Sequence, residues 1–209
     1  MRKLAVVLFA IGSLCLMAVP AFAGQGDMAF GVIGGMTMPM GCLADEDEAN
    51  MKSGLNLGGS FDYFVTKDLA LGLDASYGMM TSEDDEDVKG KTLQFGVHGK
   101  YMVPTGGQFV PYLSAGLGMY NRKVDFSDEV ADFLGLDESS FSDNVFGMNF
   151  GVGAEYKVTP TVGIGVNGAY HYTLGEFKPE VDGEEVTLLD DWTYMVFNAG
   201  VTFYFPMSK

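Results

Sequence analysis

The sequence predicts an all-β fold, an eight-stranded antiparallel up-and-down transmembrane β-barrel. Three observations support this prediction. Apolar residues alternate with small or polar residues over eight stretches, which is the two-residue period of strands with two different faces. Short turns and long acidic segments alternate between the stretches, as expected where a bilayer makes the two ends of a barrel different. After residue 23, no apolar run is long enough for a membrane-spanning helix, so strands must make the crossing.

The first 23 residues have the pattern of a secretory signal peptide and not of a fold element. Arg2 and Lys3 supply the positive start, residues 4–19 are apolar, and Ala21 and Ala23 have the spacing of a cleavage site. The predicted organisation is therefore a signal peptide over residues 1–23 and a single β-barrel domain over residues 24–209.

Each strand is predicted from its alternation. In the second stretch, for example, Leu55, Leu57 and Phe61 point to one side, whereas Asn56 and Asp62 point to the other. The same pattern predicts strands over residues 26–38, 54–66, 68–80, 91–103, from about 109, and over 145–158, 161–174 and 192–205.

The two faces of these strands differ in charge. Apart from Lys91 at the start of the fourth stretch, the apolar face carries no Asp, Glu, Lys, Arg or His, and aromatic residues gather near both of its ends. A Lys or Arg facing lipid near the midplane costs about 2 to 4 kcal/mol, so this face is expected to contact lipid. A soluble barrel would instead carry many Lys and Glu residues on its second face.

The second face is expected to line the lumen. An eight-stranded barrel is just wide enough to be filled by its own side chains, and charges buried there must be paired. We therefore expect a hydrogen-bonded plug, and the alternative is a narrow solute path between the many inward glycines. The predicted lumenal polar network consists of Asp62, Asp74, His98, Lys100, Glu155, Lys157, Asn167, His171 and Asn198.

Acidic residues mark one end of the predicted barrel. Of the 28 acidic residues, 23 lie in the segments 45–48, 83–87, 125–143 and 176–191, whereas short turns occur at 66–68, 104–108 and 159–160. Both termini then lie at the short-turn end, which is periplasmic in an outer-membrane arrangement, and the acidic loops are extracellular. The loops could attract divalent cations, but residues 85–96 do not match a calcium-binding loop because Gly96 replaces the required Glu.

The end of the chain resembles the C-terminal assembly signal of bacterial outer-membrane barrels. Asn198 and Gly200 are followed by the alternating aromatics Phe203 and Phe205. With the signal peptide, the eight strands and the loop asymmetry, this signal makes residues 24–205 similar to the small eight-stranded OmpA/OmpX-type family. The resemblance implies the bacterial cell outer membrane, insertion by the barrel-assembly machinery, contact with outer-membrane lipid and lipopolysaccharide, and a monomer.

The sequence favours a structural or cell-surface interaction role. No nucleophile, base and orienting acid lie together around His98 or His171, so no catalytic residues and no enzyme activity are expected. No cofactor or metal site is expected, and the net charge of −16 excludes nucleic acid as a partner. Two alternatives stay open, a narrow porin-like pore for small solutes and a secreted soluble ligand-binding barrel.

Overall fold

A computed structural model of the chain describes residues 24–45, 49–83, 88–125, 140–177, 180–181, 184–185 and 192–207. The predicted signal peptide lies outside the described residues, and so does most of each acidic segment. The signal peptide, and the binding of divalent cations by the acidic loops, therefore stay predictions.

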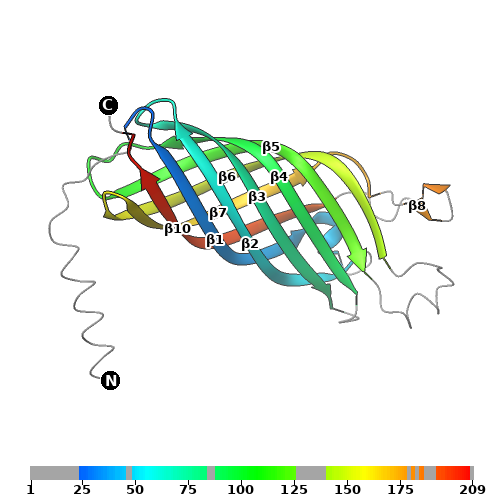
Figure 1. Cartoon of the computed structure of the whole chain (residues 1–209). Coiled ribbons are helices and arrows are strands. Elements are labelled where there is room, and N and C mark those ends of the chain that lie inside the picture. The colour runs from blue at the N-terminus through cyan, green and yellow to red at the C-terminus, as the bar shows by residue number, and fades with distance from the viewer. Residues whose placement is uncertain are drawn as a thin grey trace, which may run out of the picture.

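Eight long strands form one closed antiparallel barrel (Figure 1). Consecutive long strands pair with each other around the ring, and the first strand, β1 (Met28–Met40), closes it by pairing with the last, β10 (Thr193–Phe205). This confirms the predicted fold class. The remaining strands of the barrel are β2 (Met51–Phe64), β3 (Leu69–Ser82), β4 (Lys89–Met102), β5 (Phe109–Asp125), β6 (Ser140–Thr159) and β7 (Val162–Thr173).

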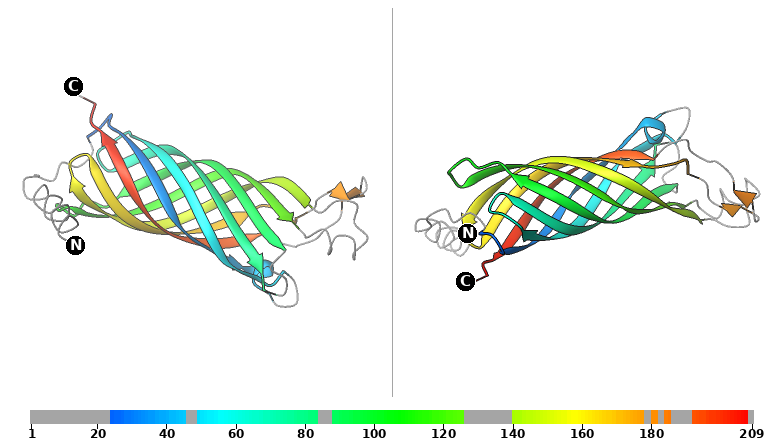
Figure 2. Two further views of the ribbon diagram at one scale, coloured as in Figure 1. Left: turned by 60° about the horizontal axis from the view of Figure 1, so that its bottom comes forward. Right: turned by 90° about the horizontal axis from the view of Figure 1, so that it is seen from above.

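The two ends of the barrel differ in their connections. The short-turn end holds the start of β1, the end of β10 and turns such as Thr66–Asp68, where the Thr66 hydroxyl accepts hydrogen bonds from the Asp68 and Leu69 amides. The opposite end, called the loop end here, carries the 3-10 helix η2 (Gly41–Leu43) and a small sheet of β8 (Glu180–Val181) and β9 (Glu184–Glu185), which projects beyond the barrel (Figure 2). Among the described residues, no helix is long and apolar enough to cross a membrane.

Several strands extend further toward the loop end than the alternation predicts. β2 begins at Met51 instead of residue 54, and β6 begins at Ser140 instead of residue 145. The reason is that outward positions beyond the lipid carry polar residues such as Lys123 and Ser142, which pair in register. The apolar period therefore ends where the lipid-facing band ends, while the hydrogen-bonded ladder continues.

The outer surface of the barrel is apolar, and its inner surface is largely polar. Leu55, Asn56 and Leu57 are 64%, 2% and 62% exposed, because successive side chains of a strand point to opposite faces. Exposed aromatic residues stand at both ends of this apolar band, with Tyr63, Tyr101, Phe109, Tyr156, Phe203 and Phe205 toward the short turns and Tyr77, Phe146, Tyr170 and Tyr172 toward the loops.

The interior has three layers along the barrel axis. A turn-end cluster of apolar side chains fills the short-turn mouth and a loop-end cluster fills the other, with polar side chains between them. The turn-end cluster comprises Ala29, Phe64, Ala70, Met102, Val110 and Tyr204. The loop-end cluster comprises Leu43, Met51, Met80, Tyr120, Val124, Phe141, Ala169, Phe177, Trp192, Tyr194 and Val196.

Candidate functional site

Three neighbouring strands bring four charged residues together in the lumen. Asp62 of β2 lies opposite Gly72 of β3, which lies opposite His98 of β4. The His98 ring therefore reaches over the glycine, with Nε2 2.7 Å from an Asp62 oxygen and Nδ1 2.9 Å from an Asp74 oxygen. Lys100 Nζ donates to the second Asp62 oxygen at 2.7 Å. A Cβ at Gly72 would lie 2.8 Å from the His98 ring, so a side chain there would displace the histidine.

Hydrogen bonding fixes the charge of His98. A carboxylate can only accept, so both ring nitrogens must donate, and the ring is an imidazolium. The charges of His98 and Lys100 then balance those of Asp62 and Asp74. Gln94 extends this group because its Nε2 donates to Asp74 at 2.5 Å and its Oε1 accepts from Ser76 at 3.1 Å.

A second charge pair lies next to the turn-end cluster. Lys157 Nζ is 2.9 Å from Glu155 Oε1 and 2.9 Å from the centre of the Tyr204 ring. The Tyr204 hydroxyl donates to the same Glu155 oxygen at 2.6 Å. With this pair, the charges of His98, Lys100 and Lys157 balance those of the three acidic residues of the predicted lumenal network, as buried charges require.

His171 belongs to a different, uncharged group. Its Nδ1 is 3.1 Å from the Tyr120 hydroxyl, and its ring stacks on Tyr194 with centroids 4.7 Å apart and planes within 4°. Asn149 contacts the same Tyr120 hydroxyl at 3.5 Å. Both histidines line one cavity, but each is held by its own partners.

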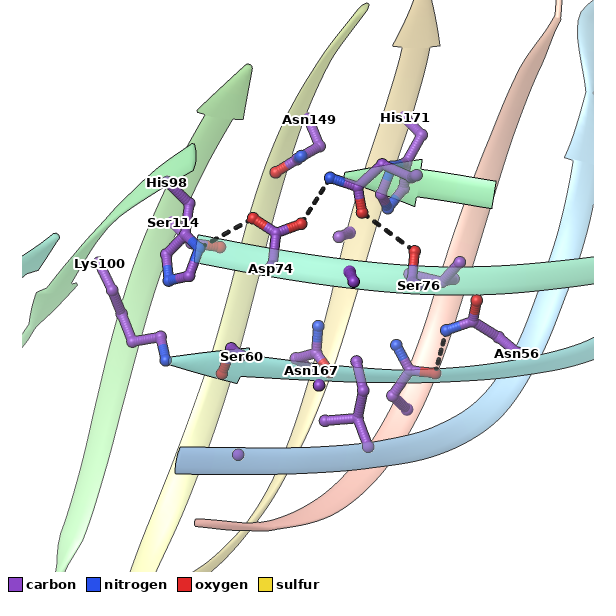
Figure 3. A pocket seen from close by; sticks show the side chains of 18 of the residues that line it. Asn56, Ser60, Asp74, Ser76, His98, Lys100, Ser114, Asn149, Asn167 and His171 are labelled. Carbon is purple, nitrogen blue, oxygen red and sulfur yellow. Dashed lines mark hydrogen bonds and ion pairs between the residues drawn. The ribbon is translucent and has the colours of Figure 1, made fainter. Parts of the chain in front are cut away.

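The cavity between the two apolar clusters has a volume of about 130 Å³. Figure 3 shows Asp74, His98, Asn167 and His171 around it. Asn56 donates to Asn198 Oδ1 at 2.9 Å, while Asn56 Oδ1 and Asn198 Nδ2 are buried without a partner among the described residues. A polar cavity of this size has room for several water molecules.

Inward glycines are matched to large inward side chains. A Cβ at Gly153 would lie 2.4 Å from the Tyr112 ring, and one at Gly163 would lie 2.2 Å from Glu155 Oε1. The space over these glycines is thus already occupied. This observation weakens the sequence argument that inward glycines leave an open path.

Arg122 is a buried residue that the sequence did not single out. It is fully buried, and its Nε donates to Asp143 at 2.8 Å while Nη2 donates to the other Asp143 oxygen. The remaining donors reach Thr173 Oγ1 at 3.0 Å and the carbonyls of Gly175 and Glu176 at 3.1 and 2.8 Å. All five N–H groups are therefore used. One feature of the sequence points to this residue, because Arg122 is the one arginine after residue 23.

Trp192 crosses the lumen at the loop end. It precedes β10, and its indole Nε1 donates to Thr92 of β4 at 2.9 Å. β4 and β10 are four places apart in the ring of eight strands and therefore lie on opposite sides of the barrel. The fully buried indole also packs on Phe177, with ring centroids 5.3 Å apart. The chain's single tryptophan was predicted to begin the last strand but not to close the mouth.

The lumen contains side chains of the kinds that bind metal ions or act as bases. Within the described ranges, no group of three His, Cys, Asp or Glu side chains could hold a metal ion. Asp62 and Asp74 engage His98 from both sides, so the ring has no nitrogen left to act as a base.

The predicted assembly-signal residues occupy β10 next to the seam with β1. Phe203 and Phe205 are exposed on the outer face, opposite Phe30 and Met28 of β1. Asn198 and Gly200 face the lumen, where a Cβ at Gly200 would lie 2.8 Å from Ile33. These positions put the aromatics in the lipid-facing band near the short-turn end.

A closed eight-stranded barrel with an apolar exterior and a charge-balanced interior defines an integral membrane β-barrel. The profile described as "Outer membrane protein beta-barrel domain" matches residues 9–205. The chain therefore belongs to this family of bacterial outer-membrane barrels.

Solved structures show the same fold at low sequence identity. Neisserial surface protein A is 19% identical with a TM-score of 0.63, and the match covers 87% of this chain and 100% of that one. OprG from Pseudomonas aeruginosa is 16% identical with a TM-score of 0.60, covering 88% and 98%. The N-terminal barrel domain of OprF from Pseudomonas aeruginosa is 23% identical with a TM-score of 0.53, covering 87% and 99%. The comparison with curated proteins finds no match.

Proposed function

We propose that this outer-membrane barrel is a closed, monomeric scaffold, with a structural or cell-surface interaction role carried by its acidic extracellular loops. The observation that carries the proposal is the hydrogen bond from Trp192 to Thr92 across the loop-end mouth. The turn-end cluster fills the other mouth, where Phe64 and Tyr204 pack with ring centroids 6.0 Å apart.

The interior supports the same proposal. In the polar layer of the lumen, Asp62, Asp74 and Glu155 each bond to a basic side chain, so a passing ion would meet paired charges between two apolar layers. The proposed function does not require chemistry in the lumen, and we propose no enzyme activity.

Liposome swelling tests whether solutes pass. Phosphatidylcholine liposomes that contain the folded protein should swell in a pentose solution at the rate of protein-free liposomes, while liposomes with an open porin swell faster. Faster swelling with this protein, at equal protein-to-lipid ratio, would contradict the closed scaffold.

A narrow solute pore is the second candidate, and one observation favours it. The polar cavity of about 130 Å³ is wide enough for water, so displacement of either apolar cluster would extend an aqueous path. Swelling in a pentose but not in a disaccharide would support this candidate.

The insertion route follows from β10. We propose that the assembly machinery recognises Asn198, Gly200, Phe203 and Phe205 before β10 pairs with β1. The variant F205A should insert more slowly in cells, as measured by the fraction of heat-modifiable protein in the outer membrane. The control is M207A, because Met207 lies after the last aromatic residue and is 56% exposed. This variant should not change the fraction.

A further inference from the structure

Four lysines form a patch on the outer wall of the barrel at the loop end. Lys52 of β2 lies opposite Thr81 of β3, which lies opposite Lys89 of β4. Lys91 of β4 lies directly opposite Lys123 of β5. Paired residues of a sheet point to the same face, so these side chains share the outer face of four neighbouring strands. We call them the lysine cluster.

The cluster begins where the apolar band ends. Two residues from Lys91, Leu93 faces outward opposite Tyr77, and these side chains are 37% and 41% exposed. Two residues of a strand correspond to about 7 Å. The ammonium groups therefore lie at the level of lipid headgroups, immediately beyond side chains that contact acyl chains.

This concentration of positive charge is unusual for the chain. Four of the nine lysines that follow residue 23 lie in the cluster, although the net charge of the protein is −16. Toward the loop end of the other half of the barrel, the outward residues Asn144, Tyr172 and Met38 carry no charge.

The cluster is only partly neutralised within the described residues. Asp125 bonds to Lys91 at 2.5 Å and to Lys123 at 2.9 Å, whereas Lys52 and Lys89 have no ion-pair partner in the described segments. Glu83, the next described acidic residue, follows β3 toward the loop and is exposed. Counting only the outer face of the described strands β2 to β5 at this end, four lysines and one aspartate give a charge of +3. Asp125 already bridges Lys91 and Lys123, so an anion bound outside the barrel would mainly neutralise Lys52 and Lys89.

We propose that the lysine cluster binds an acylated glycolipid of the outer leaflet that carries two phosphate groups. The cluster spans β2 to β5, which is about 14 Å for three strand spacings, and one phosphate cannot cover that width. The acyl chains would lie along Tyr77, Leu93 and Met119, which are exposed just below the lysines. The inference rests on the proposed extracellular orientation of the loop end but not on whether the lumen is closed.

Native mass spectrometry of the folded full-length protein tests this proposal. The protein is released from nanodiscs of phosphatidylcholine with a small fraction of bisphosphorylated lipid A, and bound lipid is counted. The wild type should retain one lipid A. The variant K52Q/K89Q/K123Q keeps the Lys91–Asp125 bond and should bind about a hundredfold more weakly, since each lysine near a membrane surface contributes about fivefold.

A matched control variant, K67Q/K178Q/K209Q, removes the same charge from other parts of the sequence and should bind as the wild type does. Replacement of the probe by monophosphorylated lipid A or by phosphatidylglycerol should weaken binding to the wild type. Equal binding by the two triple variants, or equal retention of phosphatidylglycerol, would overturn the proposal. Heat-modifiable migration confirms that each variant is folded. Nanodiscs expose both leaflets to the lipid probe, so the result does not depend on the orientation of the barrel in cells.

Discussion

Arg122 and Asp143 face each other across β5 and β6 inside the barrel and join through two N–H donors of the guanidinium. The other three donors reach β7 and the segment that follows it. One buried side chain thus links three strands to the start of the last loop. This explains why an arginine that no water can reach is stable there, since every donor has a partner.

Removal of either partner of this pair should destabilise the barrel. R122A or D143N leaves one buried charge unpaired, and the free energy of unfolding should fall by about 3 to 5 kcal/mol. Urea unfolding in lipid vesicles measures this change. The exposed pair Lys67–Asp68, with atoms 3.8 Å apart, is the control, and K67A should change stability by less than about 1 kcal/mol. Equal effects at the two sites would contradict a structural role for Arg122.

His98 should be an imidazolium in the folded barrel at neutral pH. Both ring nitrogens donate to carboxylates, so both should carry a proton in nitrogen NMR spectra. His171 is the internal control because its Nδ1 contacts a tyrosine hydroxyl and its ring stacks on Tyr194, and it should give the signals of a neutral ring. Neutral-ring signals from both histidines would contradict the proposed charge balance of the lumen.

Trp192 should contribute through both packing and its hydrogen bond. W192A should reduce stability by about 3 to 5 kcal/mol, because the fully buried indole fills the loop-end mouth. T92V keeps the packing but removes the acceptor, and it should reduce stability by about 1 to 3 kcal/mol. Thermal unfolding of W192A and T92V, followed by the far-ultraviolet circular dichroism of the backbone, compares the two variants. If W192A has no effect, the indole does not close the mouth.

Asp125 should make the stability of the barrel depend on pH in acid. Burial raises the pKa of Asp125, but hydrogen bonds from Lys91 and Lys123 outweigh this effect and lower it to about 2. A carboxyl whose pKa is depressed by folding stabilises the fold above its unfolded pKa and loses this contribution as pH falls through the folded pKa. Stability should therefore decrease between about pH 4 and pH 2.

The matched variant for this pH dependence is D125N, which cannot titrate at this position. Its unfolding free energy should decrease less than that of the wild type over the same pH interval. The difference between the two proteins isolates Asp125 from the other carboxyl groups. Parallel curves would show that the ion pairs at Asp125 do not stabilise the barrel.

The architecture was largely predictable from the sequence because the bilayer acts on every strand. Lipid excludes charge from one face, so Leu55, Asn56 and Leu57 already reveal the two sides of β2. The pairing of β1 with β10 was also predictable. An open sheet edge would leave backbone groups without hydrogen bonds in lipid, and an even number of strands allows the first and last strands to pair antiparallel.

The contacts inside the lumen could not be predicted in the same way. Alternation identifies Asp62, His98 and Lys100 as inward, but their bonds depend on register between strands, which the pattern does not specify for a Gly-rich face. The Trp192–Thr92 bond joins residues 100 positions apart and requires the closed ring. The role of Arg122 was not predicted because its partner Asp143 lies in the acidic segment 125–143, which was expected to be a loop, although β5 and β6 remain paired there.

Single-channel conductance of the purified wild type in planar phosphatidylcholine bilayers tests the central claim most directly. The account predicts no reproducible current steps at neutral pH, because apolar clusters close both mouths and the charges between them are paired. Heat-modifiable migration of the same preparation shows that the barrel is folded, and an open porin recorded in the same bilayers shows that insertion is detected. Reproducible unitary steps from the folded wild type would contradict the closed lumen.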